Sequence, residues 1–171
     1  MRRLPPLDPM FLLALALACT GADKTDDSTT DDSVPADTDP GVGILALTFN
    51  IDEDHRAVME EPCVGSFYGT IWRGDEVTGA GPDDGAVGLE DVFVETVDLT
   101  SGGPTTVLYT TGELPGIEVV ILGFLDSDAN STEEGRRPDN KDPVTLPNDN
   151  DFDVVADTTT EAEVYFGLLN P

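Results

Sequence analysis

Seven short apolar segments, each five to ten residues long, constrain the fold of this chain. Several alternate apolar and polar side chains, the period that sends every second residue to one face of a β-strand. The last segment alternates most strictly, at Ala162, Val164, Phe166 and Leu168. Turn sequences rich in Gly, Pro and Asp separate the segments, and no convincing amphipathic helix is present. The pattern predicts an all-β fold, an antiparallel β-sandwich of about seven strands, with a small barrel as the alternative. The predicted strands cover residues 42–51, 64–72, 92–99, 105–110, 117–125, 152–156 and 161–169.

Two of these segments carry more specific predictions. Residues 117–125 are the most apolar and are predicted to form a central strand that is buried on both faces. In the second segment, Phe67 and Ile71 fall on one face of the strand. Tyr68 and Trp72 fall on the other face.

The N-terminus has the pattern of an export signal. Residues 11–18 form an uninterrupted apolar run behind the positive charges of Arg2 and Arg3. A helix that spans a bilayer needs ~20 residues, so this run is too short to span and fits the hydrophobic region of a secretory signal. The small side chains of Ala16 and Ala18 lie just before Cys19, where a signal peptidase needs narrow residues.

The sequence Leu15-Ala16-Leu17-Ala18-Cys19 resembles the lipidation motif of bacterial lipoprotein signals, with Ala16 where the commonest form has Leu. The resemblance implies that residues 1–18 are a signal peptide and that Cys19 carries diacylglycerol through a thioether. It also implies an exported protein that is anchored by lipid to the cell envelope, at the outer membrane or the cell surface. An ordinary cleaved signal followed by an incidental Cys is the alternative.

Residues 19–40 have the composition of a disordered tether. Seven Asp and one Lys lie between positions 20 and 40, with almost no apolar side chains. Such a segment cannot bury enough apolar surface to offset the entropy of ordering, and its charges repel one another. The predicted organisation is a signal peptide at 1–18, a lipidated Cys and acidic linker at 19–40, and a β domain at 41–171.

The net charge of the whole chain limits the classes of partner that it can bind. Its 35 acidic and 8 basic residues give a formal net charge of −27. A chain of this charge repels phosphate backbones, so we expect no nucleic-acid partner. It attracts cations instead, and multivalent cations most strongly.

One loop has the residue types of a calcium site. Asp126, Asp128 and Asn130 place oxygen-bearing side chains at alternate positions directly after the most apolar segment. Asp139 and Asp142 follow, and calcium prefers such hard oxygen ligands. These five residues are the predicted calcium ligands, with a structural role for the ion. The alternative is that the same side chains form Asx-turns and keep the loop hydrated.

The start of this loop resembles an EF-hand loop over five residues only. Ser131 stands where the sharp turn needs Gly, and Arg137 stands where a bidentate Glu is needed. A wider stretch, residues 105–145, resembles transthyretin-like and carboxypeptidase-regulatory-like modules. The shared order is a Leu-Pro-Gly turn at 114–116, an apolar strand, Asp-x-Asp-x-Asn, and the sequence PDNKDPV at 138–144. The resemblance implies a noncatalytic sandwich, and the strand pattern favours an immunoglobulin-like or transthyretin-like one.

The chain has few of the residues that usually carry catalysis. His55 is the only histidine, whereas a zinc enzyme usually needs two or three His or several Cys. Cys63 would be a thiol nucleophile with His55 as base, but the acidic residues around it raise a thiol pKa, so we expect a buried structural Cys. Trp72, Tyr68 and Tyr109 would make a carbohydrate platform, with core packing as the simpler interpretation.

The sequence therefore predicts a lipid-anchored envelope protein that is not an enzyme. Its β-sandwich module is expected to bind or scaffold an envelope protein or a glycan and to be stabilised by calcium. The first alternative is a carbohydrate- or peptide-binding accessory module of a surface complex. The second is a hydrolase that uses paired acidic residues, a weak alternative because 35 acids supply some suitable pair in any fold.

Overall fold

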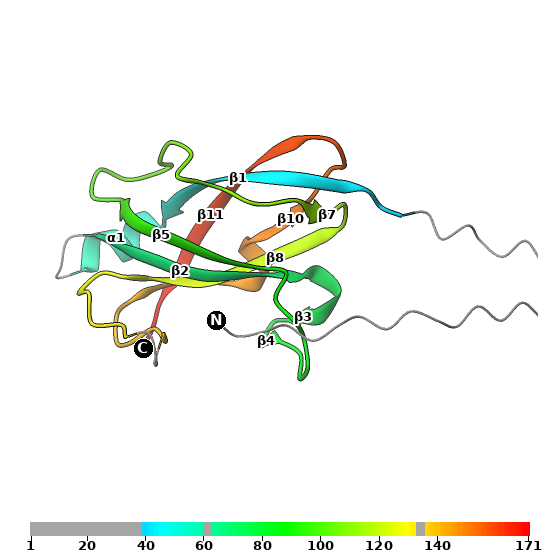
Figure 1. Cartoon of the computed structure of the whole chain (residues 1–171). Coiled ribbons are helices and arrows are strands. Elements are labelled where there is room, and N and C mark those ends of the chain that lie inside the picture. The colour runs from blue at the N-terminus through cyan, green and yellow to red at the C-terminus, as the bar shows by residue number, and fades with distance from the viewer. Residues whose placement is uncertain (1–38, 60–62, 133–135) are drawn as a thin grey trace, which may run out of the picture. The chain divides into compact units, whose positions relative to one another are not determined.

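The computed structural model describes residues 39–59, 63–132 and 136–171, and strands dominate this part of the chain (Figure 1). The predicted all-β fold is confirmed. The strands are β1 (Val42–Ile51), β2 (Val64–Arg73), β3 (Val77–Thr78), β4 (Gly81–Pro82), β5 (Glu90–Asp98), β6 (Tyr109–Thr110), β7 (Leu114–Pro115), β8 (Glu118–Asp126), β9 (Pro143–Thr145), β10 (Asp151–Asp153) and β11 (Thr159–Leu169). The helices are short: α1 (Glu53–Val58) and the 3₁₀ turns η1 (Gly74–Glu76) and η2 (Pro147–Asp149). The predicted signal peptide, Cys19 and all of the linker up to residue 38 lie outside the described residues.

Nine strands form one continuous sheet, and seven of them follow the order β5-β2-β8-β9-β11-β1-β6. Strand β10 pairs with β8, strand β7 pairs with β1, and β3 and β4 form a separate two-stranded hairpin. Because β1 and β11 run parallel, with Phe49 opposite Val164, the sheet is mixed. The prediction of purely antiparallel pairing is therefore wrong, and the sandwich is not confirmed, because the hydrogen bonds join the main strands into a single sheet.

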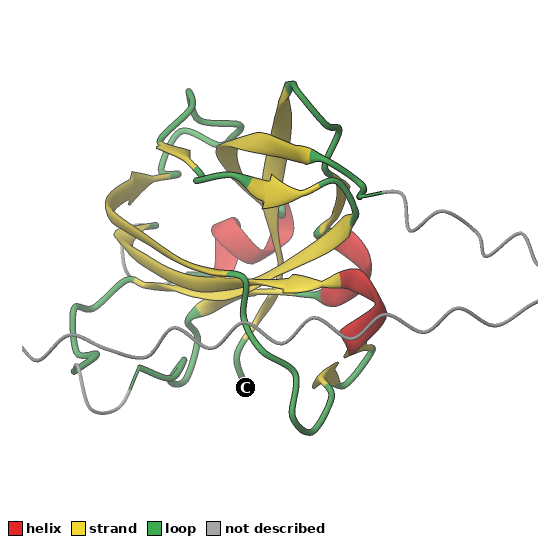
Figure 2. Ribbon diagram, turned by 45° about the vertical axis from the view of Figure 1, so that its right-hand side comes forward, coloured by secondary structure: helices red, strands yellow, loops and turns green. Residues whose placement is uncertain are grey.

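The sheet curls around its own core (Figure 2). Phe67 on β2 and Phe49 on β1 lie near opposite ends of the strand order, yet their ring centroids are 5.0 Å apart. Phe166 on β11 lies 5.8 Å from Phe67 and 6.3 Å from Phe49. All three rings are fully buried, and each contributes about 1.5–3 kcal/mol relative to an exposed ring. This aromatic cluster holds the two halves of the curled sheet together.

The ring of Phe67 lies over two glycines that face each other across β2 and β8. Gly69 and Gly123 are direct partners in the sheet. A Cβ atom would lie 2.5 Å from the Phe67 ring at Gly69 and 2.6 Å from it at Gly123, closer than atoms can approach. The two glycines therefore leave the space that the buried ring occupies.

The predicted faces of β2 are confirmed. Phe67 and Ile71 are fully buried, whereas Tyr68 and Trp72 are only partly buried on the outer face. The alternation in β11 holds up to Phe166 and then fails, because Leu168 is 41% exposed. The pairing with β9 shifts register between Phe166 and Leu168, and this bulge turns the last apolar side chain out of the core.

Strand β8 is central, as predicted, with β2 on one side and β9 and β10 on the other. Residues 119–121 and 124–126 are buried, but Glu118 at the start is exposed and Leu122 and Gly123 in the middle are partly exposed. The predicted burial on both faces is therefore incomplete. The predicted strands 105–110 and 152–156 are shorter in the structure. Between 105 and 108 the chain makes only separate backbone bonds to β1, from Thr105 to Phe49 and from Leu108 to Leu47, each 2.9 Å long.

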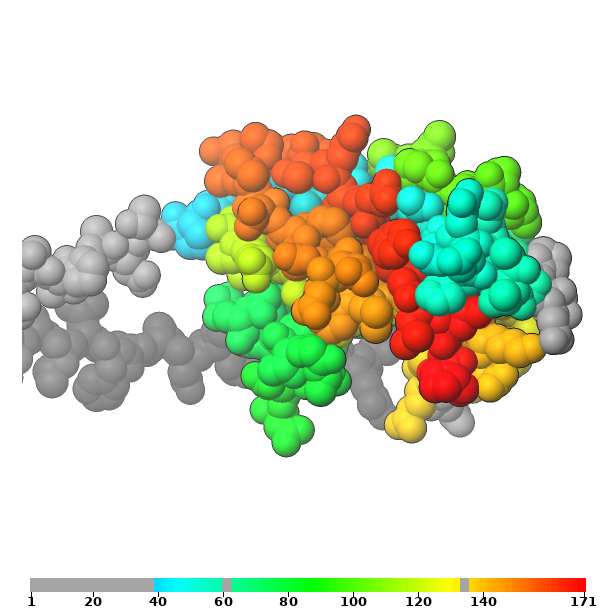
Figure 3. Space-filling model, turned by 180° about the vertical axis from the view of Figure 1, so that it is seen from behind, coloured from blue at the N-terminus to red at the C-terminus, as the bar shows by residue number. Residues whose placement is uncertain are grey.

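Helix α1 follows β1 directly and was not predicted. The carboxylate of Asp52 caps it by accepting the backbone N–H groups of Asp54 (2.9 Å) and His55 (3.1 Å). Those hydrogen bonds, chiefly the one from His55, lower the pKa of Asp52. The hydroxyl of Tyr165 on β11 donates to the second carboxylate oxygen of Asp52 at 3.1 Å, so the helix lies beside β11 (Figure 3).

Asn150 is a fully buried polar residue that joins η2 to β11. Its amide nitrogen donates to the carbonyl oxygens of Leu146 (3.0 Å) and Tyr165 (2.9 Å), and its amide oxygen accepts the N–H of Tyr165 at 2.7 Å. Its backbone carbonyl also accepts the N–H of Ile121 on β8. Each polar atom of the side chain is thus paired, which removes the penalty of burying it.

Candidate metal centre

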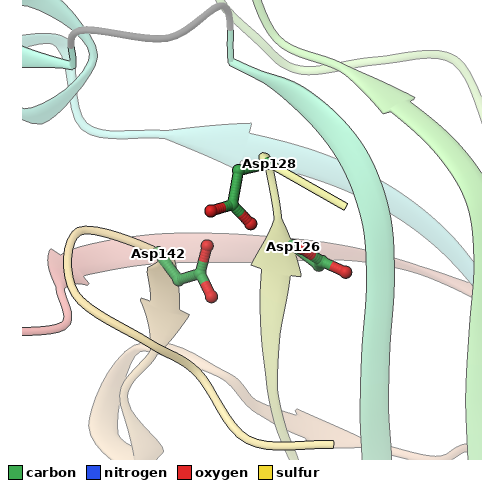
Figure 4. A group of neighbouring side chains, drawn as sticks. All are labelled: Asp126, Asp128 and Asp142. Carbon is green, nitrogen blue, oxygen red and sulfur yellow. The ribbon is translucent and has the colours of Figure 1, made fainter. Parts of the chain in front are cut away.

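Three of the predicted calcium ligands meet at one end of the sheet. Asp126 is the last residue of β8, and Asp142 directly precedes β9, the antiparallel neighbour of β8. Asp128 lies in the turn that leaves β8. One carboxylate oxygen from each of the three residues lies within 4.8 Å of the others. Figure 4 shows Asp128 and Asp142 facing each other across the gap beyond the end of β8.

Two of these three carboxylates are buried, with Asp126 4% exposed and Asp142 2% exposed. Asp126 accepts the backbone N–H groups of Asn130 and Ser131, each at 3.2 Å. Asp142 accepts the N–H groups of Asp139 (3.0 Å) and Ser127 (3.5 Å). The turn bonding that was the alternative to a metal site is therefore present, and it holds the carboxylates in place.

The buried position of Asp142 changes its acidity. Burial raises the pKa of its carboxyl to about 6, and the negative charges of Asp139 and Asp126 add to the increase. The backbone N–H groups of Asp139 and Ser127 oppose the shift, but they do not overcome it. A carboxylate that is costly to ionise gains more than an exposed one when a cation lies beside it.

The other two predicted ligands, Asn130 and Asp139, lie next to the three carboxylates and are joined to each other by a hydrogen bond. The side-chain nitrogen of Asn130 donates to Asp128 Oδ2 at 2.7 Å and to a carboxylate oxygen of Asp139. Asn130 therefore presents its amide donor, and not its oxygen, to the acidic cluster. A cation would replace that donor by turning the amide until its oxygen points inward.

A hollow of about 90 Å³ opens beside the carboxylates. Its lining includes Asp128, Asp139 and Asp142, and Met59 closes one side. The volume admits one cation with a few waters, since a water molecule occupies about 30 Å³ in the liquid. Three carboxylate oxygens supply part of the six to eight oxygen ligands that calcium takes, and water or carbonyl oxygens complete such a shell.

The predicted thiol is structural in character. Cys63 lies directly before β2 and is 3% exposed. Burial raises the pKa of its thiol to about 11, although the nearby charge of Arg56 lowers it slightly. A thiol of this kind is neutral near pH 7 and a poor nucleophile. His55 lies on α1, with its Nδ1 atom 3.8 Å from a carboxylate oxygen of Asp52.

The three aromatic residues of the predicted platform do not lie together. Tyr68 and Trp72 share the outer face of β2, whereas Tyr109 on β6 packs against the hydrophobic core. Sequence reasoning missed Phe93 and Arg136, which lie beside Tyr68. Phe93 alternates with Val92 and Val94 along β5, and this alternation was the available signal that Phe93 lies on the opposite face from the two valines.

No protein-family model, no curated protein and no solved structure matches the chain. Within residues 39–59, 63–132 and 136–171, the structure has no helix that is both long and apolar enough to cross a membrane.

Proposed function

We propose that this chain is a noncatalytic lipoprotein of the cell envelope, whose β domain binds calcium at Asp126, Asp128 and Asp142 and acts as a binding or scaffolding module. The observation that carries the proposal is the meeting of three carboxylates, two of them buried, at adjacent ends of β8 and β9. The ion has a structural role: it offsets the repulsion between these carboxylates and fixes the loop between the two strands.

The ligand chemistry supports calcium over softer metals. The three neighbouring groups are carboxylates, and among the residues that the structure describes the cluster holds no thiolate or imidazole ligand. The two strands place Asp126 and Asp142, while Asp128 lies in a turn and is exposed, so its position can adjust to a large ion. Sites of this kind in extracellular modules bind calcium with dissociation constants of about 10⁻⁴–10⁻³ M.

The location of the protein rests on the N-terminal sequence. A short apolar run, small residues and Cys19 are followed by an acidic stretch with the composition of a spacer. Such a spacer holds a domain away from the membrane surface, and at ~5–6 Å × √n a chain of 21 residues reaches on the order of 25 Å. The proposal therefore combines a lipid at Cys19, a tether and a calcium-binding domain.

Calorimetric titration tests the metal site directly. Calcium should bind the wild-type chain with one site, and Asp128→Asn should weaken binding at least tenfold, because it removes one ligand charge. Asp153→Asn, on an exposed position of β10, is the matched control and should bind as the wild type does. Absence of calcium binding by the wild type, or equal weakening by both variants, would contradict the site.

Metabolic labelling with a palmitate analogue tests the anchor. The wild-type chain should be labelled and should fractionate with membranes, whereas Cys19→Ala should lose both properties. Cys63→Ala is the matched control because it removes the other cysteine and leaves the motif intact. An unlabelled wild type would contradict the lipoprotein assignment and would leave the calcium result unaffected.

A further inference from the structure

The outer face of the sheet carries a row of aromatic rings over β5, β2 and β8. Phe93 and Phe124 are the direct partners of Tyr68 on either side. The ring centroid of Tyr68 lies 5.2 Å from that of Phe93 and 5.6 Å from that of Phe124. Phe93 is 50% exposed on the edge strand β5, whereas Phe124 is only 5% exposed, so the row is open to solvent chiefly at Phe93.

Two hollows lie on this outer face of the sheet. One hollow of about 330 Å³ is lined by Tyr68, Phe93 and Phe124, among others. A second, of about 450 Å³, is lined by Trp72 and by the β3–β4 hairpin. The two share residues of β2 and β8, including Thr70 and Leu122, so they form one trough. Their sizes fall in the range of small-molecule binding sites.

The trough differs in charge from the rest of the domain. Residues 39–171 hold 28 Asp and Glu against five Lys and Arg, a net charge of −23. The lining of the two hollows has only Asp91 and Arg136 as charged residues, one of each sign, among the residues that the structure describes. A surface that is neutral here, on a domain so acidic elsewhere, suits an uncharged ligand.

The polar groups in the trough include donors and acceptors. The Thr70 hydroxyl donates to the Asp91 carboxylate at 2.8 Å, and the remaining carboxylate oxygen of Asp91 can accept from a ligand. The guanidinium carbon of Arg136 lies 5.1 Å from the centre of the Tyr68 ring, a cation–π contact that holds N–H donors over the aromatic row. Apolar rings flanked by such groups match a polyhydroxyl ligand, which has apolar ring faces and hydroxyls of both types.

We propose that the face formed by Tyr68, Phe93, Trp72 and Arg136 binds a neutral oligosaccharide. This inference rests on the proposed function as a binding module and names the class of its ligand. The charge of the domain argues against the other chemistries. Anionic glycans, nucleic acids and anionic lipids would meet a net charge of −23. A basic peptide would find one carboxylate in the trough, and the positive charge of Arg136, which also lines it, would repel such a peptide.

Trp72 is the only tryptophan of the chain and lines the trough, so its fluorescence reports on occupancy. We would titrate the full chain with neutral hexasaccharides of glucose, xylose, mannose and N-acetylglucosamine. At least one should shift the Trp72 emission in a saturable way. Phe93→Ala and Arg136→Gln should each weaken that binding at least tenfold. Val155→Ala truncates a residue that is 51% exposed outside the trough and should bind as the wild type does.

The results separate this inference from the proposed function when each titration is run with calcium and with a chelator. Circular dichroism and the melting temperature establish that each variant is folded. If none of the sugars binds in either condition while calcium still binds the wild type, the glycan inference is wrong and the calcium site stands. Sugar binding that Phe93→Ala and Arg136→Gln leave unchanged also overturns it. The glycan inference is also overturned if a Lys/Arg-rich peptide saturates the change in Trp72 fluorescence and the sugars do not.

Discussion

The hydroxyl of Tyr109 on β6 donates a 2.8 Å hydrogen bond to the Glu90 carboxylate on β5, and this contact joins the two ends of the curled sheet. The other carboxylate oxygen of Glu90 accepts the N–H of Gly112 at 3.0 Å. Strands β5 and β6 share no ladder of backbone hydrogen bonds, so a single acidic side chain bridges the ends of the sheet.

Replacing Tyr109 by Phe should destabilise the fold by about 1–2 kcal/mol, because it removes a hydrogen bond to a charged group. Burial, followed by the contact with Glu90, raises the pKa of Tyr109 to about 12. A raised pKa means that folding favours the protonated phenol. This stabilisation is complete below the ordinary tyrosine pKa of about 10 and is lost as the pH rises towards 12.

Urea unfolding at several alkaline pH values checks this prediction. The difference in stability between wild type and Tyr109→Phe should be constant up to about pH 10 and should shrink above it. The comparison cancels the titration of the other tyrosines. A difference that grows with pH, or a variant as stable as the wild type, would show that this contact does not close the sheet.

Asn150→Ala should cost about 3 kcal/mol or more, because it leaves the buried N–H and C=O groups of Tyr165 and the carbonyl of Leu146 without partners. Asn148→Ala changes the same residue type on the exposed side of η2 and should change stability by less than about 0.5 kcal/mol. Chemical denaturation of both variants measures the difference. Similar, small losses for the two variants would be inconsistent with the role we assign to Asn150.

Gly69→Ala and Gly123→Ala should each destabilise the protein by about 1–3 kcal/mol, because the added methyl group would overlap the buried ring of Phe67. Gly79→Ala is the matched control, since a Cβ at that position meets no atom within 4 Å. Thermal unfolding of the three variants provides the measurement. If alanine at 69 or 123 were as harmless as at 79, the packing of Phe67 over these glycines would be wrong.

The longer strands could be predicted from the sequence because their signal is local. Strand β1 has the predicted bounds, and the faces of β2 follow from the alternation of Phe67 and Ile71 with Tyr68 and Trp72. Two-residue strands such as β3, β4 and β7 are too short to carry a period. The six residues of α1 bury no side chain, so the sequence has no apolar stripe from which this helix could be predicted.

Strand order and the fine structure of the site depend on contacts between distant residues. The parallel pairing of β1 with β11 is set by packing around Phe49 and Phe166, which local patterns do not encode. At the candidate metal centre, the spacing of Asp126 and Asp128 predicted a shared site. The inward donor of Asn130 was not predictable, because the direction of an amide depends on hydrogen bonds formed in the fold.

The pKa of Asp142 predicts how calcium stabilisation depends on pH. Because its pKa in the folded state is raised to about 6, the contribution of Asp142 to stability is complete below its ordinary pKa of about 4 and is lost as the pH rises through 6. Calcium binds the ionised form, so the gain in melting temperature on adding calcium should be larger near pH 7 than near pH 5. Differential scanning calorimetry at both pH values measures it, and an equal gain at both would contradict ionisation of Asp142 on binding.

The central claim is that calcium occupies the three carboxylates, and the melting temperature of Asp142→Asn near pH 7 tests it most directly. In calcium at about a hundred times its dissociation constant, the wild type should gain about 2.7 kcal/mol, or roughly 5–11 °C. Asp142→Asn removes the buried charge and keeps one of the two oxygens that accept backbone N–H groups, so without calcium it should melt near the wild-type temperature and gain little from the ion. A wild type unaffected by calcium, or a variant that gains as much as the wild type, would contradict the account.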